Sequence, residues 1–477
     1  MSLSSFSAIV PILCVTAAGI AAMLAEALRE RGERMPISGL GLIGLAGSAV
    51  TAILLWDRRA SSFGVVSADN FGLFVVLVLA AIGMLTLLFS PQLVERDGLP
   101  AGEYYALTLF ALAGMMLMAT ATDLLVIFLA LEVLSLAVYV LTAIRRDSAG
   151  GAEAAFKYFL LGAFSSAFFL YGIAFAYGLT GTTRLDRIGN VIAAGSDSPF
   201  ALLALGLLLV GFAFKVSAVP FHMWTPDAYE GAPTIVSGFM STGVKAAAFA
   251  AFTRVFLSAL EPLRAEWAPM VWVLAVATMV LGTVVAVAQT NLKRMLAYSS
   301  IAHAGYILVG LVAANEVGKS AILFYLLSYG VVNLGAFAVI ALLGTREHAN
   351  DDLPSYAGLS NRHPALAAVM AIFLLSLGGL PPTAGFVGKW YIFSAAVRSG
   401  DYALAIIGVL TSVISIFFYL RVIVMMYMAE PVDVPAPAPP SRAAIFALAL
   451  SVVVTFYLGI LPGGIMEVAA RSIGTIF

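Results

Sequence analysis

Three lysines and one glutamate lie deep inside apolar stretches of this sequence. Lys215 stands in an apolar run at 201–217, and Lys245 and Lys389 occupy similar positions in two later runs. Glu132 is the one acidic residue in the middle of such a run, LLVIFLALEVLSLAVYVL. Ionisable groups at membrane depth cost from about 3 kcal/mol to well above 10 kcal/mol, so they generally serve a function. These four residues are therefore the leading candidates for a functional site.

The chemistry that such residues perform is reversible proton binding. Transfer into an apolar interior disfavours the ammonium form of a lysine, and an approaching carboxylate favours it again. At contact distance, opposite unit charges attract by about 4 kcal/mol at an effective dielectric constant of about 20. Movement of Glu132 relative to Lys215 is therefore expected to load and unload protons. Water, serine, tyrosine and histidine groups would join such sites into a path.

Three further ionisable residues are weaker candidates for the functional site. His303 shares a helix face with serine and tyrosine side chains, although a lone buried histidine often serves only as a hydrogen bond between helices. Lys157 follows Glu153 by four residues, so an ordinary ion pair is an equal alternative to a functional role. Glu103 lies near a helix end, where an interfacial charge is the simpler interpretation.

Composition places the whole chain in a membrane. Of its 477 residues 62% are hydrophobic and 11% charged, and the mean hydropathy is +1.02. These values are typical of a polytopic membrane protein. A net charge of −1 argues against nucleic acid as a partner. The single cysteine, Cys14, excludes disulfides and iron–sulfur ligation within this chain, and four histidines leave little for haem, so we expect no redox centre here.

Apolar runs of about 20 residues recur along the sequence, and each is long enough to cross a bilayer core of roughly 30 Å. The first run has no basic start and no small-residue cleavage site, so it is expected to be a retained helix. We expect about fourteen transmembrane helices, near 6–27, 38–56, 68–90, 102–119, 122–143, 153–178, 199–230, 232–258, 269–289, 294–314, 318–343, 364–397, 402–428 and 442–463.

Two of these spans are interrupted in the middle. Pro220 breaks span seven, and His222 follows it, whereas glycines and prolines at 378–382 break span twelve ahead of Lys389. Broken helices are tolerated at membrane depth only beside protein or a watery cavity. The breaks are five spans apart, so the two broken helices cross in opposite directions, which is typical of an inverted repeat.

The predicted fold is therefore an all-α polytopic membrane protein with two inverted five-helix repeats, each containing a broken helix. We expect an N-terminal three-helix segment at 1–101 and a first repeat, spans 4–8, at 102–260. The second repeat, spans 9–13, is expected at 261–430, followed by a proline-rich linker and a last helix at 431–477.

The distribution of basic residues suggests an orientation. The first loop carries Arg29, Arg31 and Arg34, and its side of the membrane has eleven basic loop residues against eight on the other side. The positive-inside rule then places this loop in the cytoplasm and both termini in the periplasm. Arg254 and Arg421 lie within two turns of a helix end and are expected to extend to water.

Three motifs carry a family resemblance. PFHMWTPDAYEGAPT at 220–234, KRMLAYSSIAHAGYIL at 293–308 and GLPPTAGFVGKWYIF at 379–393 together resemble the antiporter-like membrane subunits of proton-pumping NADH–quinone oxidoreductase, respiratory complex I. LEVLSLAVYVL at 131–141, together with Lys389, is more similar to subunit N than to subunits L and M. The resemblance runs through nearly the whole chain.

The resemblance implies a role for each candidate. Glu132 and Lys215 match the central pair of the family, Lys245 matches the lysine between that pair and the second half-channel, and Lys389 matches the output lysine. His222 matches the histidine of the broken seventh helix, and Glu103 and Lys157 match charged positions of secondary importance.

The resemblance also implies the setting in which the chain works. It would transport protons as one subunit of a bacterial inner-membrane respiratory complex, beside the other membrane subunits of complex I and the lipid bilayer. Other subunits would bind NAD, FMN, iron–sulfur clusters and quinone, so this chain would contribute to the enzyme without a redox centre of its own.

Three alternatives remain open from the sequence. A subunit of a Mrp-type cation/proton antiporter would share the ancestral fold, and sodium-dependent transport would identify it. A secondary transporter for a small solute would show solute-dependent uptake. A purely structural membrane subunit would pump normally after Lys215 is replaced by alanine.

Overall fold

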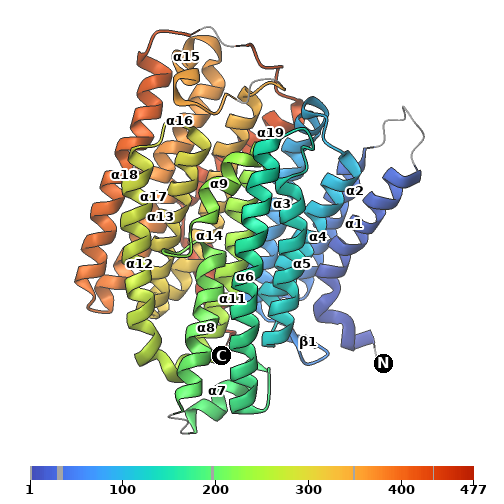
Figure 1. The fold of residues 1–477 in the computed structure, drawn as a ribbon, viewed down its shortest axis with the longest axis vertical. Coiled ribbons are helices and arrows are strands. Elements are labelled where there is room, and N and C mark those ends of the chain that lie inside the picture. Colours follow the sequence, from blue (N-terminus) through green and yellow to red (C-terminus); the bar gives the residue numbers. More distant parts are fainter. Residues whose placement is uncertain (1–2, 29–35, 195–197, 347–349, 433–434, 477) are drawn as a thin grey trace.

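The structure, a computed structural model of the chain, describes residues 3–28, 36–194, 198–346, 350–432 and 435–476. The basic first loop, with Arg29, Arg31 and Arg34, lies outside the described residues, as does part of the proline-rich linker at 433–434. The described residues are predominantly helical (Figure 1).

The N-terminal part contains three long helices and one small hairpin. Its elements are η1 (Leu3–Ile9), α1 (Val10–Leu28), α2 (Ile37–Leu54), β1 (Ala60–Ser62), β2 (Val66–Ala68) and α3 (Asn70–Asp97). The two strands pair antiparallel, with Ala60 opposite Ala68. The hairpin was not predicted, because three-residue strands are too short to show an alternating pattern.

The middle of the chain contains the first broken crossing. Its elements are α4 (Ala101–Thr120), α5 (Leu124–Thr142), α6 (Ala149–Thr180), α7 (Leu185–Ala193), α8 (Pro199–Val216), α9 (Trp224–Gly231), α10 (Thr234–Phe239), η2 (Met240–Val244) and α11 (Lys245–Leu257). Here η2 is a π-helical turn that joins α10 to α11 in one continuous span.

The last part contains the second broken crossing. Its elements are η3 (Glu261–Leu263), α12 (Arg264–Val287), α13 (Leu292–Ala313), α14 (Glu316–Leu343), η4 (Leu353–Tyr356), α15 (Leu359–Arg362), α16 (Pro364–Gly378), α17 (Ala384–Arg398), α18 (Tyr402–Met428), α19 (Arg442–Ile460) and α20 (Gly463–Ile473).

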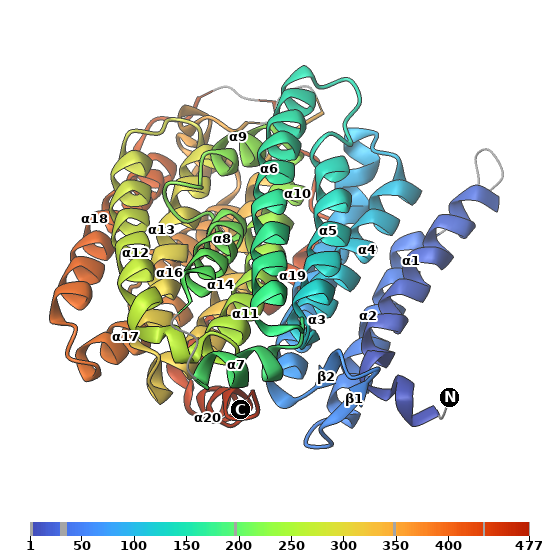
Figure 2. The same ribbon diagram turned by 60° about the horizontal axis from the view of Figure 1, so that its bottom comes forward.

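The membrane fold agrees with the prediction. Among the described residues, thirteen helices are long and apolar enough to cross a membrane, and the half-helices α16 and α17 together make one further crossing. The chain passes upward through α8 and α9 in Figure 1 and downward through α16 and α17, so the broken crossings run in opposite directions. Both termini lie at the same end of the bundle (Figure 2). The predicted domain boundary at 101/102 falls one residue inside α4, whereas those at 260/261 and 430/431 fall between helices, and the domain division stays a prediction.

The first break is stabilised by a tryptophan. α8 ends at Val216, and the next residue, Ser217, adopts the left-handed backbone conformation, φ 63°. The last carbonyls of a helix have no partner within that helix. Trp224 Nε1 donates to the Phe214 carbonyl at 3.0 Å, while the Trp224 ring stacks on Tyr158 with centroids 4.1 Å apart. The buried Phe214 carbonyl, which also accepts from Ser217 N at 3.1 Å, thus has a neutral side-chain donor as well.

The second break is stabilised by a lysine. α16 ends at Gly378, and φ at the next residue, Gly379, is +84°, a conformation that glycine adopts without strain. Lys389 Nζ donates to the carbonyls of Leu377 and Gly378 at 2.9 and 3.1 Å. A cation is favoured at this end of a helix, because the backbone dipole places partial negative charge there.

The centre of the bundle is fully enclosed by protein. The span from Thr234 to Leu257 is entirely buried, and α14 is nearly so. α12 and α13 pack with their backbones close together, since a Cβ added at Gly282 would lie 2.6 Å from the Ala302 nitrogen. Small residues allow such close approach of helices within membranes. The candidate lysines are therefore placed inside rigid, protein-lined surroundings.

The prediction that the Arg254 side chain extends to water was wrong. Its side chain is 3% exposed and forms a bidentate ion pair with Asp69 at 2.7 and 2.8 Å. Asp69 lies directly before α3, so its carboxylate was not visible as a partner in the sequence. Arg421, by contrast, reaches a helix end, where it donates to the carbonyls of Val287 and Gln289.

Candidate functional site

Lys215 is buried near the end of α8 with one neutral hydrogen-bond acceptor. Its side chain is 2% exposed, and Nζ donates to Ser135 Oγ at 2.6 Å. The ammonium group also lies over the rings of Tyr139 and Tyr158, 5.6 Å from each centroid. No carboxylate lies within ion-pair distance of Lys215 among the residues that the structure describes.

Glu132 lies on α5, one helical turn before Ser135, the residue that accepts the hydrogen bond from Lys215. It is half-buried on α5 and accepts a hydrogen bond of 2.5 Å from Ser166 of α6. Ser135 and Tyr139, three and seven residues after Glu132 on α5, both contact Lys215. Glu132 and Lys215 are therefore neighbours through α5 but make no direct ion pair in this conformation.

Lys245 follows a π-helical turn and binds a different helix. Its Nζ donates to Ser300 Oγ at 2.6 Å and to the Ser300 carbonyl at 2.7 Å. The π-helical turn η2 inserts extra backbone just before Lys245, a distortion that frequently accompanies functional sites. It also presents Ser241 to Asn333 of α14, at 2.7 Å. Neither feature was predicted, because a regular helix was assumed.

A hydrogen-bonded group surrounds His303. Its Nδ1 lies 2.7 Å from the Tyr325 hydroxyl, and its Nε2 lies 3.2 Å from the Tyr419 hydroxyl. The Tyr419 hydroxyl is also hydrogen-bonded to Ser299. Because Ser299 precedes Ser300, the partner of Lys245, this group begins one residue from that lysine. His303 therefore belongs to a polar network that links three helices.

Lys389 lies on the other side of this network. Besides the two carbonyls of α16, it donates to Ser412 Oγ at 2.9 Å, and its ammonium lies 5.1 Å from the centre of the Tyr306 ring. The Tyr306 ring packs edge-on against His303, with centroids 5.5 Å apart. The contacts thus run from Lys245 through His303 and Tyr306 to Lys389.

Two buried tyrosines contact Trp224 beside Lys215. Tyr158 lies beneath Lys215 and stacks on Trp224, which packs edge-on against Tyr229. The hydroxyls of Tyr158 and Tyr229 are buried and make no hydrogen bond among the described residues. Buried polar groups usually have a partner, and ordered water often supplies it.

Three predicted residues lie apart from the buried lysines. His222 is half-buried in the first break, and its Nδ1 makes no hydrogen bond with the described part of the chain. Glu103 is exposed, 3.8 Å from Arg146. Lys157 is 45% exposed and pairs with Glu153 at 2.8 Å, as its spacing suggested, and with Asp227 at 3.0 Å.

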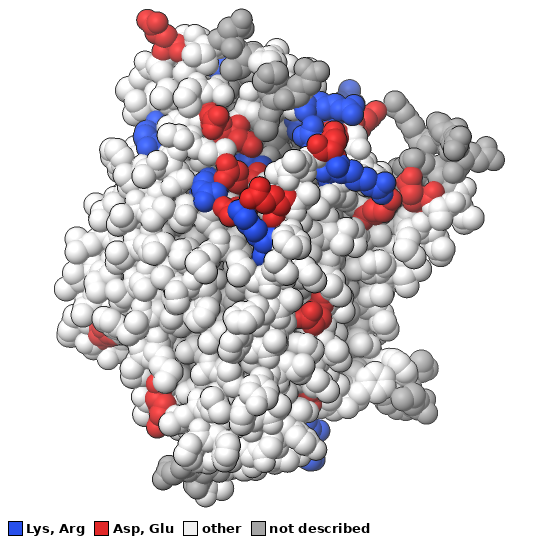
Figure 3. Space-filling view, in the orientation of Figure 1, with Lys and Arg blue, Asp and Glu red and all other residues white. Residues whose placement is uncertain are grey.

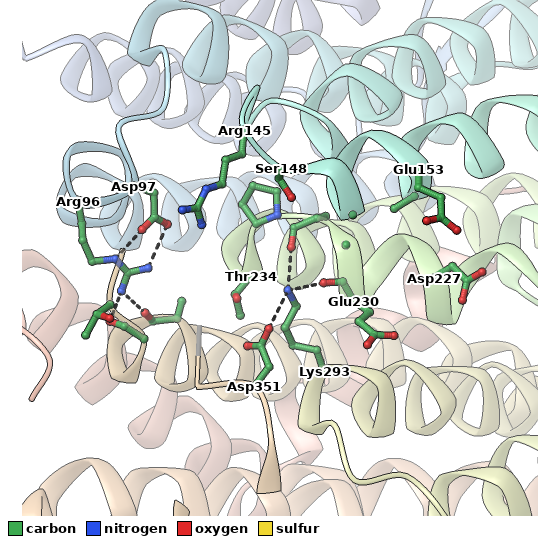
Figure 4. A pocket seen from close by; sticks show the side chains of 18 of the residues that line it. Arg96, Asp97, Arg145, Ser148, Glu153, Asp227, Glu230, Thr234, Lys293 and Asp351 are labelled. Atoms are coloured by element: carbon green, nitrogen blue, oxygen red, sulfur yellow. Dashed lines mark hydrogen bonds and ion pairs between the residues drawn. The ribbon is translucent and has the colours of Figure 1, made fainter. Parts of the chain in front are cut away.

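Lys157 lines a charged cavity of about 380 Å³ at the end of the bundle opposite the termini. Figure 3 shows that lysine, arginine and acidic side chains gather at this end. In Figure 4, Lys293 points toward Asp351 and toward the junction of α9 with α10. Its Nζ donates to the carbonyls of Glu230 and Ala232 at 2.7 and 2.8 Å and lies 3.4 Å from Asp351.

A chain of ion pairs runs along one wall of this cavity. Arg294 Nη1 contacts Asp227 and Glu230 of α9, at 2.7 Å in each case, and Asp227 also pairs with Lys157 of α6. Lys293 and Arg294 are two of the eleven basic residues that were predicted to lie in loops on the side of the first loop. The structure instead places both in the first turn of α13, and the Lys293 side chain is only 4% exposed.

Several of these partners were not predicted from the sequence. Ser135, Ser300 and Ser412 bind the three lysines, yet a serine in an apolar helix resembles many others that bond only their own backbone. Asp227 and Glu230 did offer a sequence pattern, because they lie three residues apart in PDAYEG and match the Lys–Arg pair at 293–294 in charge.

Comparison with known sequences agrees with this architecture. The family described as NADH:quinone oxidoreductase/Mrp antiporter, TM, matches residues 121–415. The chain is 45% identical to NADH-quinone oxidoreductase subunit N of Trichlorobacter lovleyi, over 99% of this chain and 98% of that one. It is 40% identical to subunit N of Mycobacterium tuberculosis, over 97% and 96% of the two chains.

Solved structures show the same arrangement. A chain of Thermus thermophilus respiratory complex I with bound aureothin matches with a TM-score of 0.83 and 37% identity, covering 96% of this chain and 99% of that one. A chain of the Mrp complex from a Dietzia species matches with a TM-score of 0.84 and 23% identity, covering 100% and 98%. At 23% identity, the match with the Mrp complex chain shows only that the two folds are alike.

Proposed function

The chain belongs to the NADH-quinone oxidoreductase subunit N family of antiporter-like membrane subunits, and from this premise we propose that it carries protons across the membrane. Its buried lysines and Glu132 would bind and release the protons. Quinone reduction in other subunits would drive the process, so the coupling would be conformational and electrostatic.

One observation carries the proposal: three buried lysines are held by neutral oxygen atoms. Lys215, Lys245 and Lys389 donate only to hydroxyl and carbonyl groups among the described residues. A lysine fixed by a carboxylate gains several kcal/mol for its charged form, and this would hold the proton in place. Neutral acceptors bind the ammonium form less strongly, so a moderate change nearby is sufficient to shift the proton.

The polar groups between the lysines support a connected route. The network of His303, Tyr325 and Tyr419 lies between Lys245 and Lys389. The buried hydroxyls at Tyr158, Tyr229, Tyr306 and Tyr329 make no hydrogen bond with the described residues, and they mark positions where water would be bound. Such water would complete the path that the side chains begin.

The chain would perform this work without a redox centre. Its single cysteine cannot hold an iron–sulfur cluster. As in the family that the chain belongs to, NAD, FMN, iron–sulfur clusters and quinone would bind to the other subunits of the complex. Those membrane subunits and the surrounding lipid would cover the exposed apolar faces of α5, α6 and α18.

The chain would lie in the bacterial inner membrane with its termini in the periplasm. The cavity end of the bundle carries Arg96, Arg145, Arg146 and Arg294, as the positive-inside rule requires of a cytoplasmic face. An alkaline phosphatase fused to the C-terminus should be active if this orientation is correct. An inactive but stable fusion would reverse it.

The decisive experiment is quinone-linked proton pumping by the assembled complex. Membrane vesicles containing Lys215→Met or Lys389→Met should assemble the complex but lose coupled acidification. Methionine keeps the apolar length of the side chain and removes the proton-binding amine. Normal pumping by both variants in a fully assembled complex would refute the proposal.

Lys319→Met provides a matched control. Lys319 lies at the start of α14, and its i,i+3 partner Glu316 is 79% exposed, so solvent weakens their ion pair. The same substitution there should leave pumping and assembly unchanged. Each vesicle preparation is also tested with and without sodium, because transport that requires sodium would indicate the antiporter alternative.

A further inference from the structure

Lys293 connects the two halves of the chain at the wall of the charged cavity. It belongs to α13, yet its ammonium group binds the carbonyls of Glu230 and Ala232, where α9 of the first broken crossing meets α10. Between them, Gly231 packs so closely on α6 that an added Cβ would lie 2.7 Å from the Gly150 carbonyl oxygen. The junction is therefore tightly held, and Lys293 is one of the groups that hold it.

Asp351 approaches the same ammonium group from the loop between α14 and α16. The loop is fixed against the start of α13, because Leu292 N donates to the Asp351 carbonyl at 2.6 Å and Leu353 N donates to Thr290 at 2.8 Å. Asp351 Oδ2 lies 3.4 Å from Lys293 Nζ. Oδ1 is buried and makes no hydrogen bond among the described residues.

This geometry differs from that of a structural ion pair. Lys293 has shorter contacts with the two carbonyls than with the carboxylate, and one carboxylate oxygen has no donor. A buried carboxylate with an unsatisfied oxygen is costly in its charged form. Burial accordingly raises the pKa of Asp351 above its usual range, while the nearby Lys293 ammonium acts in the opposite direction.

The other charged groups near Asp351 come from several elements. Glu230 of α9 and the adjacent Asp352 both disfavour its negative charge. The cavity wall also carries both signs of charge, from α3, the α5–α6 loop, α6 and α9: Arg96, Asp97, Arg145, Glu153, Lys157 and Asp227. Arg294 of α13 pairs with Asp227. The positive and negative groups are mixed, so the cavity does not favour an anionic ligand.

We propose that Asp351 is a proton-binding carboxyl group at the wall of this cavity and that Lys293 is its positioning residue. The inference rests on the proposed function and identifies where that function takes up its proton from the aqueous side. The proton arrives through the cavity from water and forms an O–H bond on the buried carboxylate. On release the same O–H bond breaks, the carboxylate is regenerated and the proton passes to water on the inner side of the cavity wall.

The position of Lys293 links this step to the first broken crossing. While Asp351 is ionised, its negative charge attracts the ammonium group away from the carbonyls of Glu230 and Ala232. Once Asp351 is protonated, this attraction is lost and the carbonyls hold Lys293 alone. Proton uptake thereby changes how firmly the junction of α9 and α10 is held.

The test compares Asp351→Asn with Asp352→Asn in vesicles that contain the assembled complex. Both substitutions remove one negative charge from adjacent positions, but Asp352 is exposed. Asp351→Asn should reduce the pumping rate by about tenfold or more, because a positioned acid–base group typically contributes a factor of this size or greater. Asp352→Asn should pump at the normal rate.

Two further measurements separate proton binding from a structural role. An infrared difference spectrum across a pH step should contain a protonated-carboxyl band that Asp351→Asn lacks and Asp352→Asn retains. Lys293→Arg should restore most of the activity that Lys293→Met loses and should displace the pH profile, since arginine keeps the charge but not the geometry. Normal pumping by Asp351→Asn, or an unchanged carboxyl band, would overturn the proposal.

The outcomes also distinguish this inference from the proposed function. If Lys215→Met abolishes pumping while Asp351→Asn does not, protons are taken up elsewhere and only this inference fails. If both variants pump normally in assembled complexes, the proposed function itself fails.

Discussion

The buried ion pair between Arg254 and Asp69 offers a quantitative test of the packing. Arg254 Nη1 and Nη2 contact the two oxygens of Asp69 at 2.7 and 2.8 Å, and the side chains are 3% and 7% exposed. Arg254 also donates to the Ala119 carbonyl and lies over the Phe71 ring, 4.9 Å from its centre. Asp69 in turn accepts from Gly72 N and caps α3. The pair thus joins α3, α4 and α11.

Arg254→Met should destabilise the folded chain by about 3–5 kcal/mol, because it leaves the Asp69 carboxylate buried with a single donor. Asp69→Asn should cost a similar amount, since the guanidinium group keeps Ala119 and Phe71 but loses its counter-charge. In the double variant neither charge remains. The double variant should therefore lose clearly less free energy of unfolding than the two single variants lose together. The difference is a coupling energy of about 1 kcal/mol or more.

The assay is reversible unfolding of the purified full chain in mixed micelles, measured for the four members of this double-mutant cycle. Arg254→Lys serves as an additional control, because lysine keeps the charge but cannot form the bidentate pair. A loss below about 1 kcal/mol for Arg254→Met would place this pair in the range of exposed ion pairs and refute the reasoning. Strictly additive losses would show that the two residues are not coupled.

Three further predictions follow. Trp224→Phe should keep the stack on Tyr158 but remove one of the two donors to the Phe214 carbonyl, leaving the Ser217 backbone N–H, with a loss of about 1 kcal/mol in the same unfolding assay. Gly282→Ala should cost about 1–3 kcal/mol, because the new methyl group meets the Ala302 backbone, and unchanged stability would contradict the close packing of α12 and α13. The raised pKa of Asp351 means that the folded chain binds this proton more tightly than the unfolded chain, so its contribution to stability falls as pH rises through the pKa of the unfolded carboxyl toward that of the folded one. Asp351→Asn should remove this part of the pH dependence, and an unchanged stability profile would count against it.

Much of the architecture was predictable because a bilayer imposes simple rules. A span must be apolar over about 20 residues, and any charge or proline within it is conspicuous. The broken crossings around Pro220 and Gly379 and the depth of Lys215, Lys245 and Lys389 were therefore evident from the residues. The boundaries of α3 and α12 were less accurate, since these helices continue past the apolar run into polar residues.

The groups that each buried charged side chain contacts were not predictable in the same way. Arg254 was expected to reach water, but Asp69 lies 185 residues away and is brought to it only by the packing of α3 against α11. Lys293 was counted as a loop charge, although the junction of α9 and α10 buries it. In both cases the deciding contact joins helices that are distant in the sequence.

The sequence by itself determined that this chain is a membrane protein, how many times it crosses, where two crossings break and that Lys215, Lys245 and Lys389 are buried. It did so because hydrophobic length and the cost of charge in hydrocarbon are properties of local segments. Only the tertiary structure decided that Lys215, Lys245 and Lys389 bind neutral oxygens, that Glu132 bonds Ser166, and that Lys293 and Asp351 meet beside a cavity. The reason is that hydrogen bonds act over about 3 Å, so their partners are set by which helix faces meet rather than by the composition of any one helix.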